Sequence, residues 1–230
     1  MQKSECEVVK PDVNPSWLNK EINVDTSLNQ MFTKQDPPDL IKSLALEAMQ
    51  TYSSSLAMFT DGSKDTQGRV GSAVYIPEIN YKYSGRIGDN LSVYTSELIA
   101  ILHCINWIID NDSNVMSNSR NVVIYSDSLS SIESLQTGKS NSRPNLIKYI
   151  IARLNAIESR NVVIMWIPSH VGISGNEQAD RLAKQALGLD YFSINVMFEA
   201  LELNEQIDVF VANLWQAEST NTRLDDSTKC

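Results

Sequence analysis

The sequence predicts an α/β domain built on a mixed five-stranded sheet, in which three antiparallel strands are followed by parallel strands and helices flank the sheet. Three strand-like runs follow one another from residue 56 to residue 88, separated by short turns that contain Gly or Pro. Two later β-branched runs, at 121–127 and from residue 161, are separated by helical segments. Strands joined through helices pair in parallel, so the later runs extend the sheet formed by the first three.

Length and composition indicate one domain with extensions. The chain has 230 residues, 42% of them apolar, which is enough for one sizeable core. Changes in pattern along the chain divide it into a poorly ordered arm at 1–36, a lead-in helix at 37–55, the folded domain at 56–188, and an acidic C-terminal extension with one amphipathic helix at 189–230.

The sequence argues against a membrane-spanning, secreted, disulfide-stabilised or zinc-binding protein. No apolar stretch reaches the roughly 18 residues of a membrane span, and Met1–Lys10 is more polar than a signal peptide. The three cysteines form no CxxC pair and are odd in number, which argues against a disulfide framework and against a zinc site. We therefore expect an intracellular protein of the cytoplasm or nucleus that has no membrane contact.

The net charge of −9 is unevenly distributed. Residues 1–55 carry 5 basic and 8 acidic groups, residues 56–188 carry 12 of each, and residues 189–230 carry 2 basic and 8 acidic groups. The acidity therefore lies in the flanks, and the predicted domain is neutral. A neutral domain is compatible with nucleic-acid binding but predicts modest affinity.

The first part of the chain consists of a polar segment, a helix and three strands. Residues 1–36 are polar and aperiodic. Pro37 and Pro38 then precede a run with apolar residues at helical spacing. The strand-like runs at 56–63, 69–77 and 79–88 come next, and such close spacing is typical of an antiparallel meander.

The second half alternates helices with buried strands. A helix is predicted over 95–110 with Thr95 or Ser96 as its cap, and Ser128 opens a helix after the strand at 121–127. Another helix is predicted over 144–158, and the last helix of the domain over 174–188, with Ser174 as its cap and Gly188 at its end. A further amphipathic stretch spans 196–215.

Four carboxylates stand at positions that can meet at one edge of such a sheet. Asp61 lies inside the first strand among apolar residues, where an ionised group is costly unless it is paired or bound to a metal. Glu97 lies in the first turn of a helix, Asp127 at the end of a parallel strand, and Asp180 near the start of the last helix. Taken singly, Asp127 is equally well an N-cap, and Glu97 and Asp180 are equally well solvated helix charges.

The segment from His170 to Asp180, HVGISGNEQAD, is the most specific motif in the chain. With TDGS at 60–63, SEL around Glu97 and YSDS at 125–128, it resembles the type I ribonuclease H family, in the family's order and with similar spacing. The resemblance covers about residues 56–188 and implies the ribonuclease H-like fold.

The resemblance implies a two-metal hydrolase that cuts the RNA strand of an RNA/DNA hybrid. Asp61 would bridge two Mg²⁺ ions, with Mn²⁺ as a substitute, Glu97 and Asp127 would hold the leaving-group ion, and Asp180 the nucleophile-side ion. His170 would assist proton transfer or product release, although a lone histidine in a Gly-rich loop is more often a surface residue.

The resemblance assigns substrate contacts to small residues and to two basic side chains. The candidates are Gly62, Ser63, Thr95, Ser96, Ser128, Arg143 and Lys148. For the two cations, a solvated helix face is an equally good interpretation. The chain resembles the branch without a basic protrusion, in which neighbouring domains help to grip the hybrid, so a reverse transcriptase or another neighbouring domain is a candidate partner.

The flanks resemble those of ribonuclease H domains in non-LTR retrotransposon polyproteins. The similar pieces are Trp17–Leu18, the following VDTSL element, and LWQ at 214–216. They suggest a retrotransposon-derived fragment or gene. Two alternatives stay open at this stage: a catalytically silent interaction module with the same fold, and a two-metal nuclease that acts on another duplex.

Overall fold

The computed structural model describes residues 21–33, 35–111 and 121–193. Its strands are β1 (Val24–Asp25), β2 (Leu56–Lys64), β3 (Arg69–Ile76), β4 (Tyr81–Asp89), β5 (Val122–Ser126) and β6 (Val162–Trp166). Its helices are α1 (Pro38–Gln50), α2 (Val93–Asp110), α3 (Leu129–Thr137), α4 (Pro144–Asn155) and α5 (Ser174–Ala186), with 3₁₀ turns η2 (Ser27–Gln30) and η3 (Pro77–Ile79). The helix predicted over 196–215 lies outside the described residues, as do two of the three flanking pieces, at Trp17–Leu18 and 214–216.

The strands form one mixed sheet in the order β1-β6-β5-β2-β3-β4. Strands β2, β3 and β4 are antiparallel neighbours, while β5 pairs with β2 and β6, and β1 with β6, all in parallel. The predicted α/β class and the meander followed by parallel strands are confirmed.

The predicted number of strands is wrong by one, because β1 adds an edge strand from a segment expected to be an aperiodic arm. Val24 pairs with Ile164, and the Tyr52 hydroxyl donates a hydrogen bond to Asp25 Oδ2 at 2.8 Å. Leu28 just beyond is fully buried. A strand of two residues is too short to show alternating apolar and polar residues, so the sequence pattern does not indicate β1. Tertiary contacts order this segment instead.

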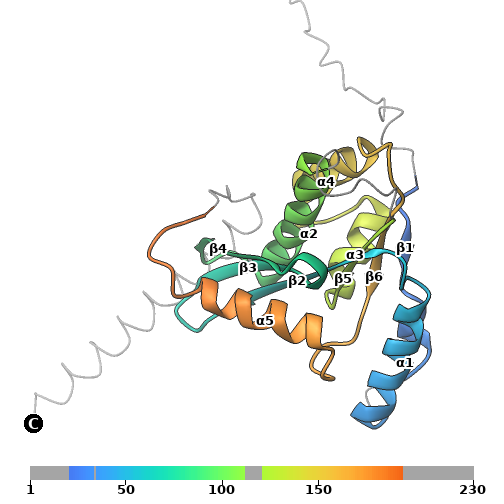
Figure 1. Ribbon diagram of the computed structural model, residues 1–230. Coiled ribbons are helices and arrows are strands. Elements are labelled where there is room, and N and C mark those ends of the chain that lie inside the picture. Colours follow the sequence, from blue (N-terminus) through green and yellow to red (C-terminus); the bar gives the residue numbers. More distant parts are fainter. Residues whose placement is uncertain (1–20, 34, 112–120, 194–230) are drawn as a thin grey trace, which may run out of the picture.

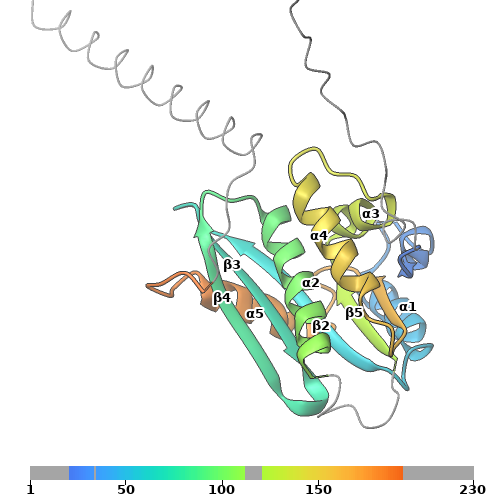
Figure 2. The same ribbon diagram turned by 90° about the horizontal axis from the view of Figure 1, so that it is seen from above.

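Helices cover both faces of the sheet, with α2, α3 and α4 on one side and α5 on the other (Figures 1 and 2). Neighbouring residues of the central strands therefore enter different cores. Met58 and its register partner Ile124 lie in the cluster beneath α2, α3 and α4. Phe59 and its partner Tyr125 lie in the cluster that includes Ala179 of α5, with their rings stacked 5.0 Å apart. Burial on both faces explains why these strands are nearly continuous apolar runs.

Several helix ends differ from the expected ones. Ser92, not Thr95 or Ser96, caps α2, because its Oγ accepts a hydrogen bond from the Thr95 N–H at 3.1 Å. Ser174 is the first residue of α5 and provides no cap, and this helix ends at Ala186, short of Gly188. Helix α4 ends at Asn155, three residues before the predicted end.

Gly62 allows α2 to lie directly against β2. A Cβ at this position would come within 2.2 Å of Ser96 Oγ and 2.8 Å of the Glu97 nitrogen. Only glycine fits this approach, which brings the first turn of α2 to the edge where β2 carries Asp61.

In the part of the chain that the structure describes, no helix combines the length and the apolarity needed to cross a membrane.

Candidate active site

Three carboxylates meet where β2, β5 and the start of α2 come together. Asp61 lies on β2, and the parallel register of Thr60 with Ser126 places Asp127, the residue directly after β5, beside it. Glu97 is in the first turns of α2. One ligand oxygen from each of the three carboxylates lies within 4.8 Å of the other two.

These carboxylates are buried more deeply than charged groups usually are. Asp61 is 6% exposed and Glu97 is 5% exposed. Burial, together with the negative charges of Asp127 and Asp180, raises the pKa of Asp61 to about 8, although the Gly62 N–H donates to its Oδ1 at 2.7 Å. Burial and the charges of Asp61 and Asp127 raise the pKa of Glu97 well above its usual value. The positive groups around the cluster therefore do not offset the negative charges inside it.

The donor set fits a divalent cation. Glu97 Oε2 is buried and has no hydrogen-bond partner, which is costly for a polar atom unless a ligand satisfies it. All of the converging atoms are carboxylate oxygens, the hard donors that Mg²⁺ and Mn²⁺ prefer. Asp61, Glu97 and Asp127 could thus hold a metal ion of this kind.

Asp127 is oriented by two residues from other elements. Asn176 Nδ2, from α5, donates to Asp127 Oδ2 at 3.1 Å, and Trp166 Nε1, from the end of β6, donates to its backbone oxygen at 3.1 Å. Burial raises the pKa of the Asp127 carboxyl, while the Asn176 hydrogen bond and the nearby His170 act in the opposite direction. Within the His170–Asp180 motif, Asn176 was not singled out from the sequence. Its position one turn before Asp180, on the same face of α5, was the available signal.

Asp180 lies at the margin of the cluster. It lines the same hollow of about 410 Å³ as Asp61, Glu97 and Asp127, and its charge contributes to the raised pKa of Asp61. Its Oδ2 is 2.7 Å from Lys184 Nζ, one turn further along α5. The structure therefore brings three of the four predicted carboxylates into mutual contact distance and places the fourth on the wall, paired with a lysine.

His170 lies on the loop between β6 and α5, at the mouth of the hollow. Its backbone has φ of 55°, and Gly172 two residues later has φ of 81°, so the loop turns twice through the left-handed region. The Gly172 N–H donates to Glu177 Oε1 at 3.3 Å, which ties this loop to the first turn of α5. His170 is exposed and near enough to Asp127 for its charge to act on that carboxyl.

Three of the predicted substrate contacts are inside the protein. Thr95 and Ser96 are fully buried and Arg143 is 2% exposed. Arg143 Nε donates to Thr95 Oγ1 at 3.0 Å, and Ser96 Oγ donates to the Val93 carbonyl at 2.7 Å. The Arg143–Thr95 bond joins the start of α4 to α2, whereas the Ser96 bond lies within α2, and Gly62 of β2 packs against Ser96. The structure thus covers all three side chains, contrary to the prediction that they contact a bound strand.

The other predicted contacts are accessible. Gly62 and Ser128 line the hollow, Ser63 is half-buried on β2, and Lys148 is exposed on α4. Four residues that line the hollow were not predicted from the sequence: Val93, Tyr94, Ser130 and Ser169. The two serines add hydroxyl groups to its wall.

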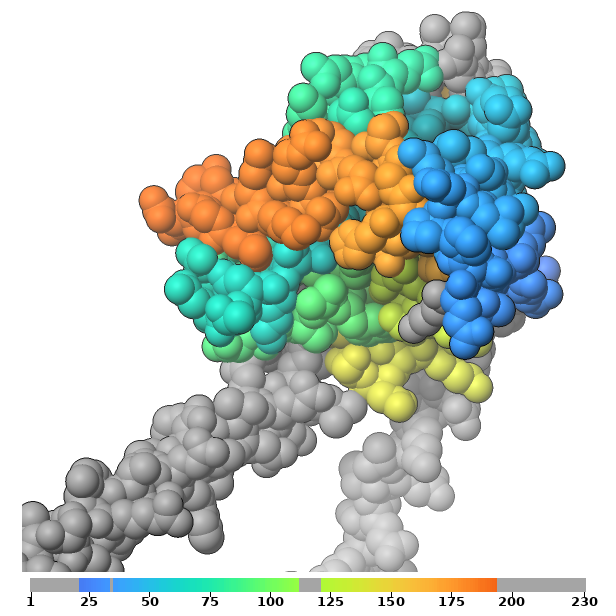
Figure 3. All heavy atoms as spheres, turned by 90° about the horizontal axis from the view of Figure 1, so that it is seen from below, coloured from blue at the N-terminus to red at the C-terminus, as the bar shows by residue number. Residues whose placement is uncertain are grey.

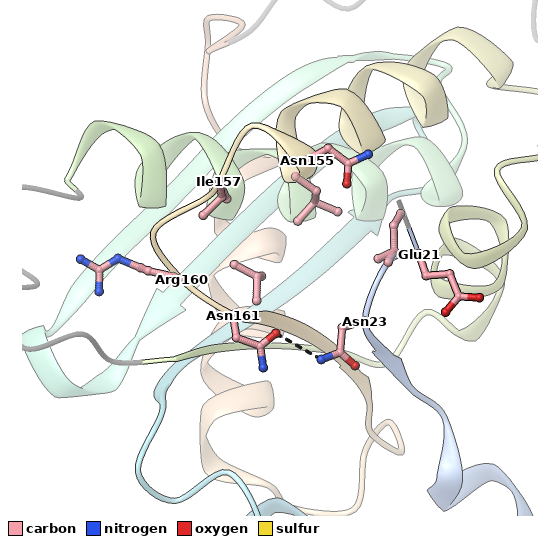
Figure 4. Close-up of a pocket in the computed structure, with 9 residues that line it drawn as sticks. Glu21, Asn23, Asn155, Ile157, Arg160 and Asn161 are labelled. Atoms are coloured by element: carbon pink, nitrogen blue, oxygen red, sulfur yellow. Dashed lines mark hydrogen bonds between the residues drawn. The ribbon is translucent and has the colours of Figure 1, made fainter. Parts of the chain in front are cut away.

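A second, smaller hollow of about 90 Å³ lies at the opposite end of the parallel strands, between β1 and the segment that links α4 to β6. Figure 4 shows Asn23 and Asn161 facing one another, with Glu21 and Arg160 on opposite sides of that pair. The Asn23 Nδ2 donates to Asn161 Oδ1 at 3.3 Å. Its described lining offers amides, one acid (Glu21) and one base (Arg160), with neither a second acid nor a histidine for metal binding or proton transfer.

Comparison with known families identifies the domain. The family model described as RNase H matches residues 53–188, which include the carboxylate cluster, the His170 loop and all of α5.

Proposed function

Because the chain belongs to the ribonuclease H family, we propose that it is a metal-dependent endonuclease that hydrolyses the RNA strand of RNA/DNA hybrids with two Mg²⁺ ions. The observation that carries this proposal is the buried cluster of Asp61, Glu97 and Asp127, whose oxygens come within 4.8 Å of one another beside an open hollow. A buried cluster of acids destabilises a fold, so its presence is best explained by a cation that neutralises it.

Each carboxylate has a place in this proposal. Asp61, Glu97 and Asp127 would hold one ion, and Asp61 with Asp180 would hold the second, with Mn²⁺ as a possible replacement for Mg²⁺. When bound, such a pair supplies an activated water and neutralises the oxygen that leaves the phosphorus. Asn176 keeps the Asp127 carboxylate in its orientation through the 3.1 Å hydrogen bond, which is the usual task of a residue that supports a metal ligand.

His170 is proposed to move protons at the mouth of the site. Its ring lies close enough to Asp127 to affect that carboxyl, and its exposed loop gives it access to solvent on one side and to the hollow on the other. A histidine so placed can take a proton from the attacking water or return one to the departing strand.

The walls of the hollow support an RNA strand as the substrate. Gly62, Ser128, Ser130 and Ser169 present backbone groups and small hydroxyls, which suit the wide minor groove and the 2′-hydroxyls of an A-form strand. Lys148 is exposed on α4 for a phosphate. With 12 basic and 12 acidic residues in 56–188, the domain binds phosphate weakly by itself, so a reverse transcriptase or another neighbouring domain would add affinity, in keeping with the proposed retrotransposon origin.

The test is cleavage of a labelled RNA/DNA hybrid by the full chain with and without Mg²⁺, compared with an Asp127→Asn variant. We expect Mg²⁺-dependent cleavage by the wild type, with 5′-phosphate and 3′-hydroxyl products, and at least about a hundredfold loss in the variant. Equal inactivity of both proteins would show a silent interaction module. A parallel panel of duplex RNA and duplex DNA tests the substrate, and preference for either one over the hybrid would overturn that part of the proposal.

A further inference from the structure

Lys184 is the basic side chain of α5 that touches a site carboxylate. Its Nζ lies 2.7 Å from Asp180 Oδ2, and the two residues are four apart with the acid first, the favourable order for a helix pair. The Asp180 side chain is only 19% exposed, whereas that of Lys184 is 58% exposed. The ammonium group therefore caps the carboxylate from the solvent side.

The ion pair occupies an oxygen that the proposed function needs. Asp180 lines the hollow together with Asp61, and the Lys184 ammonium is near enough for the charge of Asp61 to act on it as well. A divalent cation between Asp61 and Asp180 would be repelled by an ammonium at hydrogen-bond distance from Asp180. The two cations therefore compete for the same position.

The structure allows the lysine to leave without moving the helix. Ala183 and Ala186, on either side of Lys184, are fully buried against β3, and a Cβ at Gly71 would come within 2.5 Å of the Ala183 carbonyl. The backbone of α5 is therefore fixed, while its outer face lies at the surface of the molecule (Figure 3). Only the flexible four-carbon side chain has to swing, and breaking an exposed ion pair costs little.

We infer that Lys184 is the resident counter-ion of Asp180, that a divalent cation displaces it, and that the released ammonium then binds a phosphate of the nucleic-acid strand. This inference rests on the proposed function, since it assigns a positioning role to a residue beside the second metal position. It makes metal binding and strand binding successive steps. The Lys184 ammonium pairs with the Asp180 carboxylate until the ion binds there, and it then contacts the substrate.

Removing the lysine should have opposite effects on the two ligands. In the full chain, Lys184→Met should bind Mn²⁺ about two- to fivefold more tightly by titration calorimetry, the change that corresponds to one exposed ion pair. At saturating Mg²⁺ the same variant should show a severalfold higher KM for the hybrid and a salt dependence reduced by about one phosphate contact. A merely structural role would not improve metal binding while weakening strand binding.

Arg181→Met is the matched control. Arg181 lies on the same helix and contributes the same charge, but its Nη1 contacts Gln178 Oε1 at 2.8 Å. We expect this variant to bind Mn²⁺ as the wild type does, because among the described residues its guanidinium is bonded to an amide oxygen, whereas Lys184 is bonded to a carboxylate oxygen of the site. Lys184→Arg, which keeps the charge and the hydrogen bond, should also match the wild type.

The outcomes separate the inference from the proposed function. If the wild type binds Mn²⁺ and cleaves the hybrid but Lys184→Met binds the ion no more tightly than Arg181→Met does, the exchange is overturned and the nuclease stands. If Lys184→Met binds the ion more weakly, the lysine supports the occupied site and the inference is again overturned. If the wild type binds no divalent ion, both are overturned.

Discussion

Replacing Asp61 with asparagine should stabilise the metal-free protein while it abolishes metal binding. The asparagine is nearly the same size but carries no charge, so it removes the electrostatic cost of a buried acid and leaves the packing of β2 against α2 in place. The effect should be largest at neutral and alkaline pH, where an unfolded chain has this carboxyl ionised.

The magnitude follows from the pKa of Asp61, which rises from 3.8 to about 8 in the folded protein. The folded state therefore binds the proton more tightly than the unfolded state does, and the free energy of unfolding falls as pH rises between those two values. Each pKa unit corresponds to about 1.4 kcal/mol, so at pH 7 the buried Asp61 carboxyl lowers the free energy of unfolding by about 4 kcal/mol. Asp61 is only 6% exposed, so solvent screening reduces this figure little; the variant should recover about 2 to 4 kcal/mol.

Urea denaturation in EDTA at pH 5 and pH 8 measures the effect. We expect the wild type to lose stability between the two pH values relative to Asp61→Asn, and Mg²⁺ to restore stability to the wild type alone. Glu133→Gln, which removes an exposed carboxyl on α3, should follow the wild type. An Asp61→Asn variant that is no more stable than the wild type at pH 8 in EDTA would refute the reasoning, because the cluster would then carry no electrostatic cost.

Three further perturbations test the parts around the cluster. Gly175→Ala should destabilise the fold by about 1 to 3 kcal/mol in chemical denaturation, because its Cβ would lie 2.3 Å from the Phe59 ring. Adding Phe59→Leu to that variant should recover part of the lost stability. A Gly175→Ala variant as stable as the wild type would contradict this packing. Asn176→Ala should weaken Mn²⁺ binding about tenfold in calorimetry by freeing Asp127 Oδ2, and unchanged affinity would show that the contact does not orient the ligand. His170→Ala should lower kcat for hybrid cleavage by about a hundredfold or more with Mn²⁺ affinity preserved, whereas an unchanged kcat would remove the histidine from proton transfer.

Strands and carboxylates were predictable for different reasons. Burial on both faces forces β5 and β6 to be continuous apolar runs, so the sequence pattern alone identifies them. The site residues could be predicted only because several weak local signals occur in one order along the chain, since Glu97 or Asp180 taken singly has an ordinary explanation as a solvated helix charge. The edge strand β1 gave no such signal, because Val24–Asp25 is held by a partner strand more than a hundred residues away.

The substrate contacts were the least predictable part. Arg143 and Lys148 look alike in sequence, yet the first is 2% exposed and the second lies on the outer face of α4. The angle at which α4 packs against α2 decides which cation is covered, and local periodicity does not contain that angle. For the same reason the sequence did not indicate the contacts of Asn176 and Lys184, because these depend on how close α5 lies to the end of β5.

The most direct test of the account is anomalous diffraction from crystals of the full chain soaked with Mn²⁺ and a hybrid. We expect two manganese peaks about 4 Å apart, one contacted by Asp61, Glu97 and Asp127 and the other by Asp61 and Asp180, with Lys184 displaced from the Asp180 carboxylate. Manganese bound elsewhere, with Glu97 Oε2 still without a partner, would contradict it.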